Sequence, residues 1–389
     1  MKVGEQTGIP CTVLRGGTSK GVYFHERDLP PSGPLRDKVL KRVMGTPDVV
    51  QIDGLGGSRL ITSKVAIIKR SERPDSDIDY TFGQVEVERD NIHWSGNCGN
   101  ISAGVGPFAI NAGLVEVIEP TTIVRIFNTN TKKHLIAHVP VEAGRAKVEG
   151  DFAIDGVPGT GAEIFMDYRG TVGARTGRML PTERVSEFLS LEDGTELEVS
   201  FCDVGNPCVF FRAVDIGLTG SELPEDINNN QPLIEKLREI RCKSVVRLGF
   251  CDDWREAETK APQGPLIVMV APPADYHSMR REPVVANAMD LRARLVFYNK
   301  CHESMAGTGS MCTAAASRIE GSVVNRALGA PPGGRDVLRI GHPLGVMHVK
   351  VKARPANTMG GVEFEALGFG RTARHIMEGT VYVPNSFFI

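Results

Sequence analysis

The amino-acid sequence predicts a protein of the α+β class that is built from two related halves. Short runs of β-branched residues recur along the 389-residue chain, and 43 glycines and 24 prolines separate them. Long helical patterns are few. Two of them follow turns of small residues, at Asn97–Asn100 and at Ala306–Gly309, and this repetition indicates that both halves share one design.

The individual elements are predicted from local pattern. Strands are expected where apolar and β-branched side chains run together, because such residues pack well on pleated sheets: Lys64–Lys69, Ile123–Phe127 and Leu266–Val270. Helices are expected at Pro34–Met44, Ile101–Ala112, Gln231–Arg247 and Ser310–Ile319. A charged stretch follows Met179–Thr182, so we expect one domain over residues 1–184 and a second over 185–377.

Composition excludes several classes of function. A hydrophobic content of 41% and a charged content of 24% are typical of globular proteins. The net charge of -2 and the scattered Lys and Arg residues argue against nucleic-acid binding and favour a small-molecule partner. No apolar run is long enough to span a membrane, and the N-terminus lacks the pattern of a signal peptide, so we expect a cytoplasmic protein. Eight cysteines without CxxC pairs indicate reduced thiols and no metal site.

Cys98 is the first candidate for chemistry. It precedes a predicted helix, where unsatisfied backbone N–H groups favour negative charge on a thiol and attract a substrate carboxylate. A small packed cysteine without chemistry is an equally good interpretation of this local pattern.

Lys64 is the second candidate. It stands at the head of an apolar strand, where burial would lower the pKa of the ammonium and make it a base. An exposed lysine is the commoner case at such a position.

Two further segments suggest anion binding. Arg15–Gly21 is rich in glycine, hydroxyl groups and positive charge, yet it lacks the spacing of a nucleotide-binding loop. His302 precedes the small-residue turn of the second half and is a candidate ligand contact.

Taken together, the motifs resemble those of the PrpF family: Arg15–Gly21, Gln51–Gly57, Thr62–Lys64 and Trp94–Asn100. The resemblance continues to Met377–Gly379 and so covers nearly the whole chain. The family includes isomerases of 2-methylaconitate, aconitate, 4-oxalomesaconate and 3-methylitaconate. The resemblance therefore implies the diaminopimelate-epimerase fold, in which two similar α+β domains each wrap a sheet around a central helix and the active site lies in the cleft between them. It also implies that a C-terminal strand, about 378–389, completes the first domain.

One departure from the epimerases bears on the chemistry. Diaminopimelate epimerase has a cysteine at the start of each central helix. Cys98 matches the first, whereas Ala306 occupies the second position, and Cys312 lies farther along the predicted helix. Epimerisation of an amino acid therefore becomes the less favoured reaction.

The resemblance to the PrpF isomerases implies that Lys64 and Cys98 form the catalytic pair. We expect Lys64 to remove an allylic proton and Cys98 to return one, although a close thiol and amine titrate as a coupled pair. The expected reaction is cis–trans or double-bond-shift isomerisation of an aconitate-like tricarboxylate, such as 2-methylaconitate or aconitate. It needs no metal, nicotinamide, flavin or pyridoxal cofactor. Tautomerisation of 4-oxalomesaconate and isomerisation of methylitaconate are the alternatives.

Contacts to the substrate are expected from both halves: Arg15, Gly17, Thr18, Ser19, Lys20, Ser63, Gly99, Asn100, His302, Gly307, Thr308 and Gly309. A function of another class is a non-catalytic accessory protein of an aconitase-type dehydratase. The presence of both Lys64 and Cys98 favours the enzyme, because binding alone needs neither group. A homodimer is compatible with this interpretation.

Overall fold

The computed structural model describes residues 2–262, 264–330 and 335–389, and the chain divides into two compact units. The first comprises Met1–Met166 with Gly370–Ile389, and the second comprises Asp167–Phe369. This division falls earlier in the chain than the expected boundaries at 184 and 377. Residues 167–184 bond within the second unit: the Gly173 N–H donates to Asp203 O at 2.8 Å, and the Asp203 N–H donates to Met179 O at 2.9 Å.

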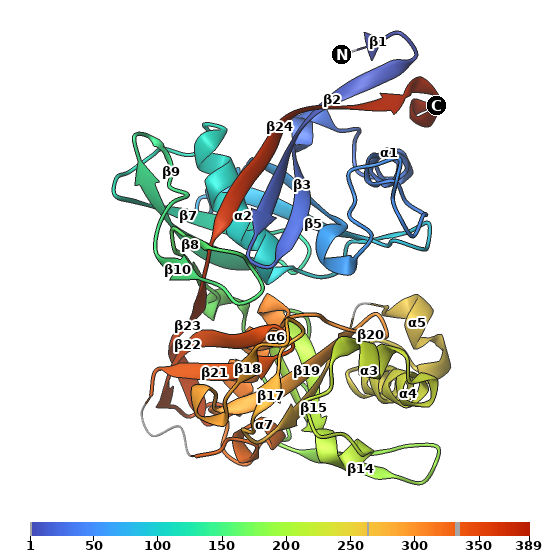
Figure 1. Cartoon of the computed structure of the whole chain (residues 1–389), viewed down its shortest axis with the longest axis vertical. Coiled ribbons are helices and arrows are strands. Elements are labelled where there is room, and N and C mark those ends of the chain that lie inside the picture. The colour runs from blue at the N-terminus through green and yellow to red at the C-terminus, as the bar shows by residue number, and fades with distance from the viewer. Residues whose placement is uncertain (1, 263, 331–334) are drawn as a thin grey trace. The chain divides into compact units, whose positions relative to one another are not determined.

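The first unit contains a mixed sheet, a separate two-stranded sheet and two helices of more than ten residues. Its strands are β1 (Lys2–Val3), β2 (Gln6–Gly16), β3 (Ser19–His25), β4 (Lys64–Arg70), β5 (Ile78–Val85), β6 (Ile92–His93), β7 (Thr121–Asn128), β8 (Lys133–Glu142), β9 (Arg145–Ala146), β10 (Phe152–Ala153), β11 (Thr160–Gly161), β12 (Ile164–Asp167) and β24 (Ala373–Pro384). Its helices are α1 (Pro34–Met44) and α2 (Gly99–Asn111). The C-terminal strand β24 runs antiparallel beside β2 (Figure 1), which places the end of the chain in the first unit.

The second unit contains more helices. They are α3 (Pro224–Asn228), α4 (Gln231–Arg247), α5 (Ala257–Lys260), α6 (Gly307–Ala316) and α7 (Val323–Arg326). Its strands are β13 (Glu187–Ser190), β14 (Glu196–Val204), β15 (Asn206–Arg212), β16 (Leu266–Ala271), β17 (Tyr276–His277), β18 (Pro283–Val284), β19 (Leu291–Phe297), β20 (Lys300–Cys301), β21 (Val337–His342), β22 (Gly345–Pro355) and β23 (Val362–Arg371).

The two sheets follow the same pairing order. In the first unit β2 pairs antiparallel with β3, β3 parallel with β4, β4 antiparallel with β5, β5 parallel with β7, and β7 antiparallel with β8. The second unit has the same alternation of antiparallel and parallel pairs, in the order β14, β15, β16, β19, β21 and β22. Each parallel pair needs a crossover, and helices fill these connections. The two halves therefore share one topology, as their similar turns predicted.

The helices α2 and α6 occupy equivalent crossovers, from β5 to β7 and from β19 to β21. Every residue of α6, and every residue of α2 except Asn111, is buried. A helix that is buried on all sides needs apolar and small side chains all round, which both sequences supply. Each unit therefore has a central helix against which its strands pack.

The other face of each sheet carries the second helical layer. In the first unit α1 contributes Val39 and Val43 to a core that includes Val65 and Ile67 of β4. In the second unit α4 packs in the same way against β15 and β16. Within the described ranges no helix is long and apolar enough to cross a membrane.

Candidate active site

Lys64 is a buried amine at the start of β4. The residue is only 5% exposed, and its Nζ lies 5.4 Å from the centre of the Phe82 ring. Its Nζ donates a hydrogen bond to Oε1 of Gln84, the residue opposite it on β5. Burial lowers the pKa of Lys64, and the charge of nearby Cys98 acts in the opposite direction. A lowered pKa is the direction that a general base requires.

Gln84 has its amide orientation fixed by backbone carbonyls. The side chain is fully buried, and its Nε2 donates to Ser63 O at 2.9 Å and to Leu60 O at 3.2 Å. Carbonyl oxygens only accept hydrogen bonds, so Oε1 must point at the amine of Lys64. Ser63, expected as a substrate contact, is itself fully buried, and its Oγ accepts a hydrogen bond of 2.8 Å from Gln51. Ser63 therefore belongs to the hydrogen-bonded residues that hold Gln84 beside Lys64.

Cys98 is the N-cap residue of α2 and is half-buried. Its backbone is held at the helix start because its carbonyl accepts bonds from the Ser102 N–H at 2.8 Å and the Ser102 Oγ at 2.9 Å. The thiol makes no capping hydrogen bond. The charge of Cys98 raises the pKa values of both Lys64 and Tyr23. A Cβ on Gly21 would lie 3.0 Å from Cδ1 of Ile101 and 3.1 Å from the carbonyl oxygen of Lys64, so Lys64 lies beside the first turn of α2, which follows Cys98.

Tyr23 is a further residue of this cluster, one that sequence reasoning missed. It is fully buried on β3, and its hydroxyl donates to Ile101 O of α2 at 2.6 Å. Burial raises the pKa of Tyr23 well above its usual value, and the charge of Cys98 adds to this effect. A tyrosine in a strand is normally predicted as a core residue, so nothing in the sequence indicated that Tyr23 lies near a thiol.

The glycine-rich hairpin between β2 and β3 lies on the start of α2. Gly17 has a φ of 51° at the first position of a two-residue loop, as in type II′ turns. A Cβ at Gly17 would lie 2.2 Å from Oδ1 of Asn100, so only glycine allows this approach. Asn100 holds the loop, since its Nδ2 donates to Thr18 Oγ1 at 3.1 Å.

Several cations surround this hairpin. Nη1 of Arg15 donates to Gly17 O and Thr372 O, each at 2.9 Å. Nζ of Lys20 lies 3.3 Å from the position that a Cβ on Gly57 would take. The motifs Arg15–Gly21 and Gln51–Gly57 are therefore neighbours in the structure.

Arg371 is a buried cation that sequence reasoning also missed. It is 4% exposed, and its Nε donates to Oδ1 of Asn100 at 3.0 Å. Together with the N-terminus of α2, where Gly99 begins the helix, these cations create a positive environment suited to carboxylates. The buried hydroxyl of Ser19 has no hydrogen-bond partner among the described residues and is a further donor for a ligand.

The start of α6 repeats the start of α2 in the second unit. Ala306 is the N-cap residue of α6, the position that Cys98 holds in α2. This equivalence supports the assignment of Ala306 to the second thiol position of the epimerases. Cys312 is fully buried, and its Sγ donates to Cys202 O at 3.0 Å.

The predicted binding residues of the second unit lie around this helix start. Gly307 is buried, and a Cβ on Gly309 would lie 2.3 Å from Cδ1 of Leu295. Thr308 is 2% exposed, and its Oγ1 accepts a hydrogen bond of 3.0 Å from Asn206. His302 is half-buried, with Nδ1 3.0 Å from the Ser304 N–H that donates to it. Among the described residues no three or more His, Cys, Asp and Glu side chains are grouped to hold a metal ion.

Comparison with known proteins gives matches along almost the entire chain. A family model described as PrpF protein matches residues 6–384. The 3-methylitaconate isomerase of Eubacterium barkeri is 48% identical over 383 residues, which cover 98% of this chain and 99% of that protein. The 2-methyl-aconitate isomerase of Cupriavidus necator is 39% identical over 396 residues, covering 98% and 99%.

Solved structures agree with these matches. A crystal structure of methylitaconate-delta-isomerase has a TM-score of 0.80 and 47% identity, and the match covers 99% of this chain and 98% of that one. A hydroxyproline epimerase from Agrobacterium vitis has a TM-score of 0.56 at 12% identity, over 99% and 94% of the two chains, and shows likeness of fold alone. The predictions of an epimerase-like α+β fold and of an isomerase are confirmed.

Proposed function

The chain belongs to the PrpF family, and we propose that it is a cofactor-free isomerase that moves a proton and a double bond on a small unsaturated polycarboxylate. The observation that carries this proposal is the buried amine of Lys64, whose pKa is lowered and which lies near the thiol of Cys98. A desolvated amine and a thiol in one place are unnecessary for simple binding, and both suit proton transfer at carbon.

In the proposed mechanism Lys64 is the base. Its neutral amine donates one N–H to Gln84, which holds the nitrogen in place and leaves the lone pair for the substrate. The lone pair takes a proton from the carbon next to the double bond, and the C–H electrons spread into the adjacent alkene and carboxylate. The positive charges around α2 stabilise the negative charge that develops there.

Cys98 completes the transfer. Its S–H gives a proton to the other end of the allylic anion, and the double bond then occupies its new position. The resulting thiolate recovers a proton from the Lys64 ammonium, so both groups return to their initial state. Burial of the Lys64 ammonium, which lowers its pKa, favours this last step.

Substrate carboxylates are proposed to bind at the start of α2, with Arg15, Lys20 and Arg371 as cations. Gly17, Thr18, Ser19, Gly99 and Asn100 line the same hairpin and helix start. From the second unit we retain His302, Gly307, Thr308 and Gly309 as proposed contacts, because α6 begins as α2 does. Ser63 is assigned to positioning of Lys64, since its hydroxyl and carbonyl bind Gln51 and Gln84.

The first substrate to test is 3-methylitaconate, because the isomerase named for it is 48% identical, against 39% for the 2-methyl-aconitate isomerase. 2-Methylaconitate, aconitate and 4-oxalomesaconate complete the panel. A cytoplasmic location and a homodimer belong to the same proposal, and analytical ultracentrifugation tests the dimer.

Proton NMR in deuterium oxide tests the proposed function. Chelator-treated protein is incubated with each acid of the panel, and the position of the double bond and the deuterium content are followed together. We expect at least one acid to isomerise with deuterium incorporation and without any additive. Trans-4-hydroxy-L-proline is the negative control, because Ala306 replaces the second thiol. No turnover of any acid, together with stimulation of an added aconitase-type dehydratase, would instead identify an accessory protein.

A further inference from the structure

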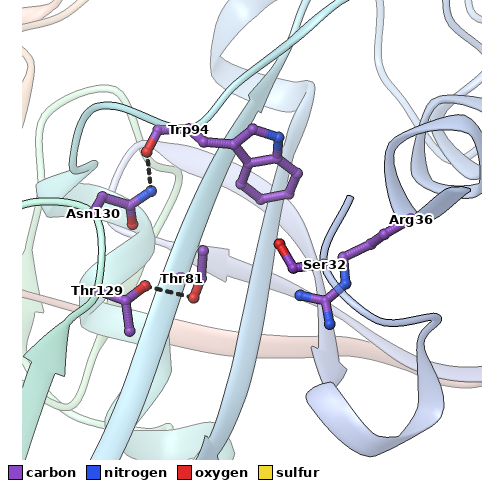
Figure 2. A pocket seen from close by; sticks show the side chains of 6 residues that line it. All are labelled: Ser32, Arg36, Thr81, Trp94, Thr129 and Asn130. Carbon is purple, nitrogen blue, oxygen red and sulfur yellow. Dashed lines mark hydrogen bonds between the residues drawn. The ribbon is translucent and has the colours of Figure 1, made fainter. Parts of the chain in front are cut away.

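The first unit contains a cavity on the face of its sheet opposite to Lys64. Its volume is about 250 Å³. Six residues line it, and Figure 2 shows them: Ser32, Arg36, Thr81, Trp94, Thr129 and Asn130. Successive side chains of a strand point to opposite faces of a sheet. On β5, Thr81 therefore faces this cavity, whereas Phe82 and Gln84 face the amine of Lys64. The cavity is thus separate from the proposed catalytic pair.

Arg36 supplies a buried positive charge to this cavity. The residue is 6% exposed, and its Nε donates to Pro30 O at 2.7 Å, which fixes the side chain. Nη1 lies 3.7 Å from the carboxylate of Glu26, and Nη2 donates no hydrogen bond to any of the described residues. The guanidinium points into the cavity beside Ser32 (Figure 2).

The charges around Arg36 leave room for one negative group. Glu26 lies closer to Lys69, at 3.0 Å, than to Arg36, at 3.7 Å, so the charge of Arg36 is only partly balanced. A buried cation favours a ligand that brings the opposite charge and accepts hydrogen bonds in the plane of the guanidinium. The cavity therefore suits a monoanion, in contrast to the several cations around α2.

The remaining walls are rigid and include a flat aromatic surface. Asn130 uses its whole amide on the backbone: Nδ2 donates to Phe82 O at 2.9 Å and to Trp94 O, and Oδ1 accepts from the Phe82 N–H at 2.8 Å. These bonds hold Trp94, whose ring forms one wall (Figure 2). Thr81 and Thr129 are joined by a hydrogen bond of 2.6 Å on the opposite side.

We propose that this cavity is a second ligand site, which binds a small monocarboxylate with a flat carbon skeleton. The carboxylate accepts hydrogen bonds from Nη2 of Arg36 and from the hydroxyl of Ser32, and the carbon skeleton lies against the ring of Trp94. The volume is just below the range of about 300–1,000 Å³ that is usual for small-molecule sites, so the ligand is about the size of benzoate. Inorganic phosphate is negatively charged like this carboxylate, but it has no flat carbon skeleton to lie against Trp94.

Tryptophan fluorescence provides a direct test. The chain has two tryptophans, so Trp254→Phe leaves Trp94 as the sole reporter. In this background the protein is titrated with benzoate, with benzamide as the neutral analogue and with inorganic phosphate as the bare anion. We expect a saturable response to benzoate. Benzamide should bind at least about tenfold more weakly, because it lacks the charge-assisted hydrogen bond. Phosphate should neither change the Trp94 signal nor displace benzoate at equal concentration.

Variants assign the response to this cavity. Arg36→Met should weaken benzoate binding at least about tenfold by removing the charge. Ser32 is exposed at the cavity mouth, so Ser32→Leu should block binding without touching the core and serves if Arg36→Met fails to fold. Lys64→Met should leave benzoate binding unchanged. The proposal is overturned by the absence of a saturable response, by equal affinity for benzamide, by displacement with phosphate, by full binding in Ser32→Leu, or by loss of binding in Lys64→Met.

Discussion

Replacing Gln84 by Glu is expected to move the acid limb of the pH profile of kcat/KM to higher pH. Gln84 Oε1 accepts a hydrogen bond from the amine of Lys64, and both side chains are buried. A carboxylate in the same place stabilises the ammonium form, so the pKa of Lys64 rises. Below that pKa the base is protonated and inactive, and activity returns as the pH increases through it.

The size of this shift follows from Coulomb's law. Two unit charges 4 Å apart attract each other by about 4 kcal/mol at an effective dielectric constant of about 20. One pKa unit corresponds to about 1.4 kcal/mol, so the full effect is about 3 pH units. Desolvation of the new carboxylate offsets part of this attraction. We therefore expect the acid limb to move upward by at least about one unit, with about a tenfold loss of rate per unit at lower pH.

Steady-state rates of isomerisation between pH 5 and 10 give this profile for wild-type and Gln84→Glu proteins. Gln84→Met is the matched control, because it removes the acceptor without adding charge and should not move the limb upward. Since an amine and a thiol titrate as a pair, the same profile is measured with Cys98→Ser as background. An acid limb that stays at its wild-type position in Gln84→Glu would refute Lys64 as the group that titrates.

Three further predictions follow from the same contacts. Lys64→Met should melt at a higher temperature than wild type near pH 7, since it removes the cost of a buried amine. Because the folded-state pKa of Lys64 is lowered, the stability of the wild type rises with pH up to the unfolded pKa of about 10.4. Calorimetry should therefore show the two melting temperatures converging as the pH rises, and a constant difference between them counts against this prediction. Arg371→Met should reduce kcat/KM by about 10–100-fold, mainly through KM, with partial recovery in Arg371→Lys; steady-state kinetics with an unchanged KM would remove Arg371 from the binding site. Thr308→Val should raise KM at least about fivefold by deleting a hydroxyl at the start of α6; an unchanged KM in the same assay would exclude a substrate contact there.

Helix positions were predicted best where local signals mark the start of the helix. The bounds of α1 and α4 agree with the predicted ranges, Pro34–Met44 and Gln231–Arg247. Proline near the start of each helix and, for α4, an Asn230 side chain that accepts a hydrogen bond from the Leu233 N–H carry that information in the sequence itself.

The two central helices begin earlier than predicted, and the reason is physical. Helix α2 starts at Gly99 and α6 at Gly307, two and three residues before the expected positions Ile101 and Ser310. Neither helix has a capping side chain, so no local pattern marks its start. Burial inside a sheet stabilises glycine-containing turns as helix, and this tertiary effect overrides the low helix propensity of glycine.

The functional cluster was predictable only in part. Lys64 and Cys98 were identified because each stands in a motif with its own chemistry. Gln84 could have been found only from the register between β4 and β5, which places it opposite Lys64. Arg371 bonds to Asn100 across 271 positions of sequence, and Tyr23 resembles core in its own strand. Such long-range contacts arise from topology, which a single sequence does not encode at the level of individual side chains.

The central claim is that Lys64 removes a proton from carbon. Solvent deuterium incorporation and net isomerisation, measured side by side by proton NMR, test it for Lys64→Met and Cys98→Ser. Lys64→Met keeps the apolar stem and deletes the amine, so both rates should fall at least about a hundredfold while the fold survives. Cys98→Ser leaves the base in place and weakens the acid, so isomerisation should fall more than exchange. A Lys64→Met protein that exchanges substrate protons at the wild-type rate would contradict lysine as the base.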